Sequence, residues 1–330
     1  MRALLGFLLA SAVFAAVDGT VTNRTTGKPQ AGVTVTLYKL GEGGLESVES
    51  VKSDSAGKFR IDQNLQGPRL LQSAYSGVTY NHMLPPGTPS TGVALDVYES
   101  SKQQGDAKVT EHMVVFEPGE SELAITEGFL WANTGKTTFD DPQDGTLRFQ
   151  APPGATQIEV NVTAPQGMPI RRPATPTGEP GVYKVDFPIK PGQSTVRVNY
   201  KAPYKSPAAF ESRIFYKNGG PTVFFVPPGV TIKGDGLKSE GVEPTTKATM
   251  FQTTAASYKI EIEGTGLLRR PQEGDQEEQK GPSITFVLPK LYQKMYWVLA
   301  LAGSILLLGF VLLYRAGQPA ASVKGSGSGK

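Results

Sequence analysis

The sequence contains no cysteine and only two histidines, His82 and His112, among 330 residues. The absence of cysteine excludes disulfides, thiolate metal sites and cysteine nucleophiles. An excess of charge of one sign is also lacking, because 33 Lys and Arg are balanced by 30 Asp and Glu, which leaves a formal net charge of +3. This balance provides no strong field for recruiting nucleic acid, so we predict no nucleic-acid partner.

Helical spacing of apolar residues is rare between residues 18 and 263, where apolar residues recur at every second position. This alternation predicts an all-β fold. The 38 glycines and 26 prolines supply turns between short strands, a layout that favours tandem β-sandwich modules. The clearest predicted strands are residues 32–38, 93–98, 109–116, 123–132, 158–163, 182–187, 195–200, 210–216, 222–226 and 258–263.

The two ends of the chain carry its longest apolar runs. Residues 1–16 combine a basic Arg2 with a short apolar stretch and small residues, which is typical of a secretory signal peptide. Residues 295–314 contain no charge and are long enough to cross a bilayer once as a transmembrane helix. We therefore predict a single-pass membrane protein with exported N-terminal domains and a short cytoplasmic tail, residues 315–330.

The first predicted module, residues 17–84, carries a set of turn and strand motifs. Asp54 and Gly57 predict a tight hairpin turn, because aspartate bonds its own backbone and glycine tolerates positive φ. The motifs are Val17-Asp18-Gly19-Thr20-Val21, Gly27-Lys28-Pro29, Gly32-Val33-Thr34-Val35-Thr36-Leu37 and Ser53-Asp54-Ser55-Ala56-Gly57-Lys58-Phe59. Together they resemble the carboxypeptidase regulatory-like domain, a prealbumin-like seven-strand β-sandwich, in proteins of the exported, membrane-anchored bacterial type.

The resemblance implies an accessory module and not a catalyst. The peptidase of the family name resides in a separate zinc domain, and this sequence has neither an H-x-x-E pair of zinc ligands nor a third histidine. We accordingly predict no enzyme activity, no cofactor, and no catalytic, cofactor-binding or metal-binding residues. The resemblance places the protein in a bacterial inner membrane facing the periplasm, or on the cell surface. Some relatives share carbohydrate-binding-like folds, which keeps a glycan as an alternative ligand.

A second β region is predicted over residues 88–265, after a stiff linker from Pro85 to Pro89. Its strands are numerous enough for one large or two small sandwiches. If there are two, the predicted boundary between them lies at residues 203–207. The polar residues 266–290 predict a flexible stalk.

Two sequence motifs imitate ligand sites. Gly135-Lys136-Thr137 resembles the end of a phosphate-binding loop, but residue 130 is leucine where the first glycine is needed, so a hairpin turn is favoured. Asp140, Asp141 and Asp144 cluster in sequence, and their spacing differs from the calcium-loop pattern. A solvated turn is therefore favoured over a Ca²⁺ site.

Three rare side chains are natural candidates for chemistry. A catalytic zinc normally needs three protein ligands, so His82 and His112 are predicted to be exposed or packed among polar groups. Trp131 is the only tryptophan outside residues 295–314. We favour it as a core anchor over an exposed platform for a sugar ring.

These observations predict a membrane-anchored extracytoplasmic β-sandwich protein that acts as a non-catalytic binding or scaffolding module. Its expected partner is a protein or glycan of the cell envelope. The alternatives are a carbohydrate-binding envelope protein and a hydrolase that uses a carboxylate pair, with Asp140 or Asp141 as one member. Because Ala300 and Ser304 do not extend into a continuous small face, the predicted span favours an anchor over a stable oligomer.

Overall fold

The computed structural model describes residues 16–41, 44–63 and 67–268. All regular structure in this part of the chain is β-strand, which confirms the predicted all-β class. A search of the same residues for a helix able to cross a membrane finds none. The predicted signal peptide up to residue 15, most of the stalk, the predicted span at 295–314 and the tail at 315–330 lie outside the described residues.

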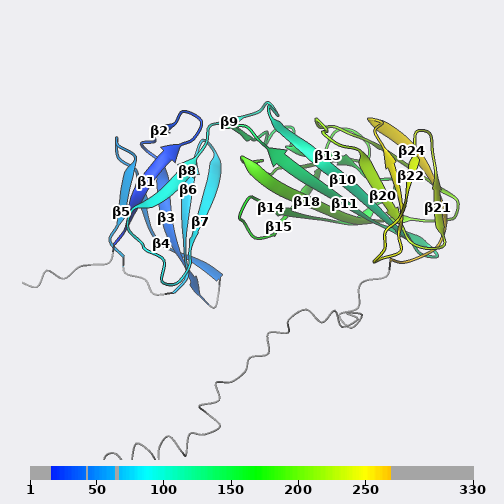
Figure 1. Cartoon of the computed structure of the whole chain (residues 1–330), viewed down its shortest axis with the longest axis horizontal. Helices are drawn as coiled ribbons and strands as arrows, with labels where there is room; N and C mark the ends of the chain where they lie inside the picture. The colour runs from blue at the N-terminus through cyan, green and yellow to red at the C-terminus, as the bar shows by residue number, and fades with distance from the viewer. Residues whose placement is uncertain (1–15, 42–43, 64–66, 269–330) are drawn as a thin grey trace, which may run out of the picture. The chain divides into compact units, whose positions relative to one another are not determined.

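The N-terminal part folds into two four-stranded sheets around a shared apolar core (Figure 1). Val33, Val35 and Leu37 are fully buried, as the alternation predicted. One sheet contains β1 (Val17–Asn23), β2 (Lys28–Pro29), β5 (Lys58–Ile61) and β8 (Val93–Val97). The other contains, in spatial order, β4 (Gly44–Lys52), β3 (Thr34–Gly41), β6 (Arg69–Tyr75) and β7 (Val78–Leu84).

The predicted hairpin turn before β5 is confirmed. Asp54 Oδ1 accepts hydrogen bonds from the backbone amides of Ala56 and Lys58 at 2.9 and 2.8 Å. Gly57 adopts a φ of 73°, which few side-chain-bearing residues tolerate. The chain then returns Phe59 and Ile61 to the core.

The last strand of this sandwich, β8, runs parallel to β1. Its Val93, Leu95 and Val97 belong to the same buried cluster as the strands before residue 84, so the described sandwich extends to Val97. Gly19 lies opposite Val93, and a Cβ added at Gly19 would be only 1.9 Å from the Val93 carbonyl oxygen.

The larger C-terminal part packs an eight-stranded sheet against two three-stranded sheets around one buried cluster (Figure 1). The eight-stranded order is β15 (Ile170–Arg172), β14 (Thr156–Thr163), β18 (Gly192–Pro203), β11 (Glu122–Asn133), β10 (Ala107–Pro118), β20 (Thr222–Val226), β23 (Thr249–Thr253) and β22 (Lys238–Val242). One of the smaller sheets has the order β13 (Leu147–Gln150), β17 (Val182–Val185), β16 (Ala174–Pro176). The other has the order β19 (Ala208–Arg213), β24 (Ser257–Gly264), β21 (Val230–Lys233). A short parallel pair joins β9 (Ser100–Ser101), which follows the N-terminal sandwich, to β12 (Thr138–Phe139), which follows β11.

Both edges of the eight-stranded sheet are poor templates for a further strand. The three-residue β15 is bracketed by Pro169 and Pro173, which lack an amide hydrogen. At the other edge every residue of β22 is exposed, and the strand carries the charged residues Lys238 and Glu240. Its register with β23 shifts before Gly241. Prolines, charges and bulges of this kind protect sheet edges from pairing with another chain.

Candidate functional site

The structure places the residues that stood out in the sequence in separate environments. His82 is exposed on β7, whereas His112 is buried on β10. Trp131 is fully buried, which confirms it as a core anchor and removes it as a sugar-stacking platform. Gly135 lies in a turn, where its amide donates to Asn133 Oδ1 at 3.0 Å.

The acidic stretch also forms a turn. The Gly145 amide donates to the Asp141 carbonyl oxygen at 2.7 Å, and the Asp144 amide donates to Asp141 Oδ1 at 3.2 Å. In residues 16–41, 44–63 and 67–268, no three His, Cys, Asp or Glu side chains are grouped so as to hold a metal ion. The pKa of Asp140 is raised by burial and then by the nearby charges of Asp186 and Asp141.

His112 belongs to a buried polar network that the sequence did not reveal. Its Nε2 lies 3.1 Å from Glu127 Oε2, and its Nδ1 lies 3.1 Å from the Thr222 hydroxyl. The Tyr200 hydroxyl donates to the other Glu127 oxygen at 2.6 Å. His112, Glu127 and Tyr200 are each at most 3% exposed, so the network is sealed inside the core.

The polar groups of this network are packed among buried side chains. Burial, followed by the Glu127 charge, raises the pKa of Tyr200 well above its usual value. The ring of His112 stacks on Phe129, with 4.4 Å between ring centroids. The hydrogen bonds of the network join β10, β11, β18 and β20 inside the core.

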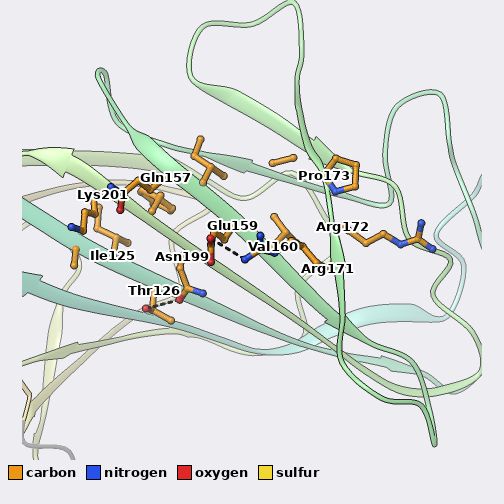
Figure 2. A pocket seen from close by; sticks show the side chains of 14 residues that line it. Ile125, Thr126, Gln157, Glu159, Val160, Arg171, Arg172, Pro173, Asn199 and Lys201 are labelled. Atoms are coloured by element: carbon orange, nitrogen blue, oxygen red, sulfur yellow. Dashed lines mark hydrogen bonds and ion pairs between the residues drawn. The ribbon is translucent and has the colours of Figure 1, made fainter. Parts of the chain in front are cut away.

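A groove of about 830 Å³ opens over four strands of the eight-stranded sheet (Figure 2). A β-bulge in β14 lies at the groove. The register between β14 and β18 shifts between Thr156 and Glu159, and Gln157 adopts a φ of 54°. Such a bulge bends its strand and opens space beside it. The lining residues come from β11, from β14 with its bulge, from β15 and the segment after it, and from β18: Ala124, Ile125, Thr126, Gln157, Ile158, Glu159, Val160, Arg171, Arg172, Pro173, Ala174, Asn199, Tyr200 and Lys201.

Four of the polar side chains that line the groove form two pairs. The Thr126 hydroxyl donates to Asn199 Oδ1 at 2.9 Å, and Arg171 Nη2 lies 3.0 Å from Glu159 Oε1 (Figure 2). The side chains of Glu159 and Arg171 remain 49% and 70% exposed. The Glu159–Arg171 pair is therefore accessible to a ligand.

The groove continues into a row of outward-facing side chains that crosses six strands at matched register positions. In this transverse row each residue lies directly opposite the next, and its neighbours along the strand face the core. At a strand spacing of about 4.8 Å the row extends about 24 Å. It consists of Glu159, Asn199, Thr126, Val115, Phe225 and Met250, the first three polar and the last three apolar and half-buried.

Arg172, which also lines the groove, and Lys190 carry two further positive charges. Arg172 is on the opposite side of β15 from Arg171, and its guanidinium carbon lies 5.9 Å from the centroid of the Phe187 ring. Lys190 Nζ lies 5.2 Å from the centroid of the Tyr80 ring and donates to the Thr79 carbonyl oxygen. Burial, and then the charge of Arg172, lowers the pKa of Lys190 to about 8.

This shift predicts a pH dependence of stability. Between pH 8 and about pH 10 the unfolded chain keeps Lys190 protonated while the folded chain releases the proton, so the free energy of unfolding should rise with pH. Above pH 10 the raised pKa of Tyr80, about 12, acts in the opposite direction. Urea unfolding at intervals from pH 7 to pH 10 should give a rise in the original chain that is absent from Lys190→Met. Parallel curves for the two proteins would contradict the assignment.

Comparisons with known proteins identify no family for this chain. No family model matches, and no curated protein matches. Among solved structures, a point mutant of an M1 zinc metallopeptidase from Deinococcus radiodurans matches with a TM-score of 0.29 and 12% identity. The unmutated enzyme from the same organism matches with a TM-score of 0.28 and 13% identity. Each match covers 48% of this chain and 43% of the peptidase, and at these TM-scores the likeness carries no functional argument.

Proposed function

We propose that this protein is a membrane-anchored, extracytoplasmic binding module that holds a polypeptide partner on the outer face of its eight-stranded sheet. In this proposal residues 17–97 act as an accessory sandwich of the carboxypeptidase regulatory-like type. Residues 295–314 anchor the chain, and the described domains are exported.

The observation that carries the proposal is the transverse row. Its polar half offers the amide of Asn199 and the hydroxyl of Thr126 to the backbone of a ligand. Its apolar half offers half-buried Val115, Phe225 and Met250 to apolar side chains. A polypeptide combines these two chemistries along its length, and the blunted edges of the sheet favour binding through the face.

A glycan is the weaker candidate for this groove. Sugar rings are commonly bound against an exposed aromatic face. Tyr200, the sole aromatic residue among the groove-lining residues, is 2% exposed, and Phe225 of the transverse row is half-buried.

Hydrolysis is also poorly supported by the groove. Glu159 is the only carboxylate among the residues that line it, and that carboxylate is paired with Arg171. Glycoside hydrolysis usually needs two carboxyl groups flanking the bond. Asp140 and Asp141, either of which was the candidate for one member of such a pair, do not line the groove.

Peptide and glycan arrays probed with the detergent-solubilised full chain test the proposal. Asn199→Arg and Phe225→Arg fill the two halves of the row and should each reduce peptide binding by about tenfold or more. Thr231→Arg, on an exposed position of β21 in another sheet, is the matched control and should bind like the original chain. Binding to glycans alone, lost in the same two variants, would favour the glycan; binding unaffected by either variant would exclude this face.

A further inference from the structure

Gly128 leaves a bare stretch of backbone on the outer face of the eight-stranded sheet. It lies within β11, opposite Met113 of β10 on one side and Arg197 of β18 on the other. Its neighbours along the strand, Glu127 and Phe129, are buried, so position 128 faces outward. We refer to this glycine with its two cross-strand neighbours as the Gly128 gap.

The packing of the sheet does not require a glycine at this position. Gly128 has no positive φ, and a Cβ added to it would meet one described atom, Met113 Cε, at an ordinary contact distance of 3.6 Å. The register of β11 with both neighbouring strands is regular there. At Gly19, by contrast, the Val93 carbonyl oxygen excludes any side chain. A glycine weakens a strand interior and often marks the close approach of a ligand, so Gly128 points to a binding site.

The two side chains of the gap are exposed and can contact a ligand. Met113 is 42% exposed although it lies on a strand paired on both sides. Arg197 is exposed, and within the described residues no carboxylate lies within ion-pair distance of it. The strands that carry these two residues are about 10 Å apart, so the gap has room for one side chain. The next outward position on each of the three strands belongs to the transverse row, about 7 Å away.

We propose that the Gly128 gap binds an aromatic side chain of the polypeptide partner. A guanidinium such as that of Arg197 stacks on the face of an aromatic ring, and the thioether of Met113 makes a favourable contact with a ring edge. Aromatic rings also cover the bare backbone of glycines within sheets. An aliphatic side chain would contact Met113 as well, but it would gain nothing from the guanidinium. Only the polypeptide nature of the ligand rests on the proposed function.

Methyl NMR of the full chain tests the ring site alone, with N-acetylphenylalaninamide as the probe. The Met113 methyl signal is identified among those of the six methionines by its loss in Met113→Leu. The probe should shift this signal upfield, because the face of a ring shields a methyl group beside it. N-acetylleucinamide should not, and Arg197→Gln should weaken the response.

Two substitutions at the gap and one control show where the probe binds. Gly128→Ala adds a methyl that fits and should weaken the response, whereas Gly128→Val fills the gap and should abolish it. Ala132→Val, at another outward position of β11, is the matched control and should respond like the original chain. Both valine variants should resist urea at least as well as the original chain, because β-branched residues favour strands. No shift with the phenylalanine probe, or an equal shift in Gly128→Val, would overturn the proposal.

A second arm separates this inference from the proposed function. Array peptides that bind should lose about tenfold in affinity when their key aromatic residue is changed to leucine, and Gly128→Val should remove that difference. If peptides bind but neither their aromatic residues nor Gly128→Val affects binding, the proposed function stands and the ring site fails. If no peptide binds while the probe still shifts the Met113 signal, the proposed function fails and the ring site stands.

Discussion

Glu127→Ala is expected to lower the free energy of unfolding by about 3–5 kcal/mol, because two buried polar groups lose their shared hydrogen-bond acceptor at once. The truncation leaves His112 Nε2 and the Tyr200 hydroxyl without their acceptor in a core that water does not reach. Urea unfolding of the full chain carrying Trp297→Phe, so that fluorescence reports buried Trp131 alone, measures the loss. A change below about 1 kcal/mol would contradict the buried network.

A double-mutant cycle separates this cost from the net value of the pair. His112→Leu and Glu127→Leu should each be strongly destabilising, because each leaves the other polar group unpaired. The double variant should recover much of the loss, because replacing both hydrogen-bond partners by apolar side chains of similar size can be nearly neutral. Tyr200→Phe in the same background then tests whether the tyrosine depends on the carboxylate.

Gly19→Ala is expected to destabilise the N-terminal sandwich by about 3 kcal/mol or more, at the upper end of overpacking effects. The new methyl would overlap the Val93 carbonyl oxygen, which belongs to the backbone and can move only if β8 separates from β1. Amide hydrogen exchange in β1 and β8 should accelerate while exchange in β10 and β11 is unchanged.

Gly178→Ala is the control for that substitution, because a Cβ at Gly178 meets no atom within 4 Å. It should change stability by less than about 0.5 kcal/mol. Unaltered exchange in the β1 and β8 amides of Gly19→Ala would show that the two strands are not packed as closely as described.

Period-two alternation predicted many, but not all, of the strands that bury one face: the four-residue strands β13 and β21 also alternate and were not predicted. Each of the ten predicted strands overlaps an observed strand, since a buried face requires regular apolar spacing. Strands without a buried face gave no such signal: β4 is mostly exposed and β22 is exposed throughout. The parallel pairing of β8 with β1 was also beyond reach, because register between distant segments depends on tertiary packing.

The candidate site could be predicted from the sequence only in part, because its residues meet through tertiary packing. Alternation from Leu123 and Ile125 to Phe129 and Trp131 does place Glu127 on the buried face of its predicted strand, and a carboxylate there needs a partner. That signal could have identified the network, although not His112 as the partner. The transverse row joins residues from six strands, so no single stretch of sequence contains its pattern.

The parallel pairing of β1 and β8 has a mechanical consequence. Force applied between the N-terminal end of β1 and the C-terminal end of β8 pulls these neighbouring strands past each other along their common axis. The register pairs from Gly19–Val93 to Asn23–Val97 then share the load at the same time, and they must rupture together. Antiparallel neighbours pulled from one end would instead open one pair after another. The N-terminal sandwich is therefore built to resist extension along the chain.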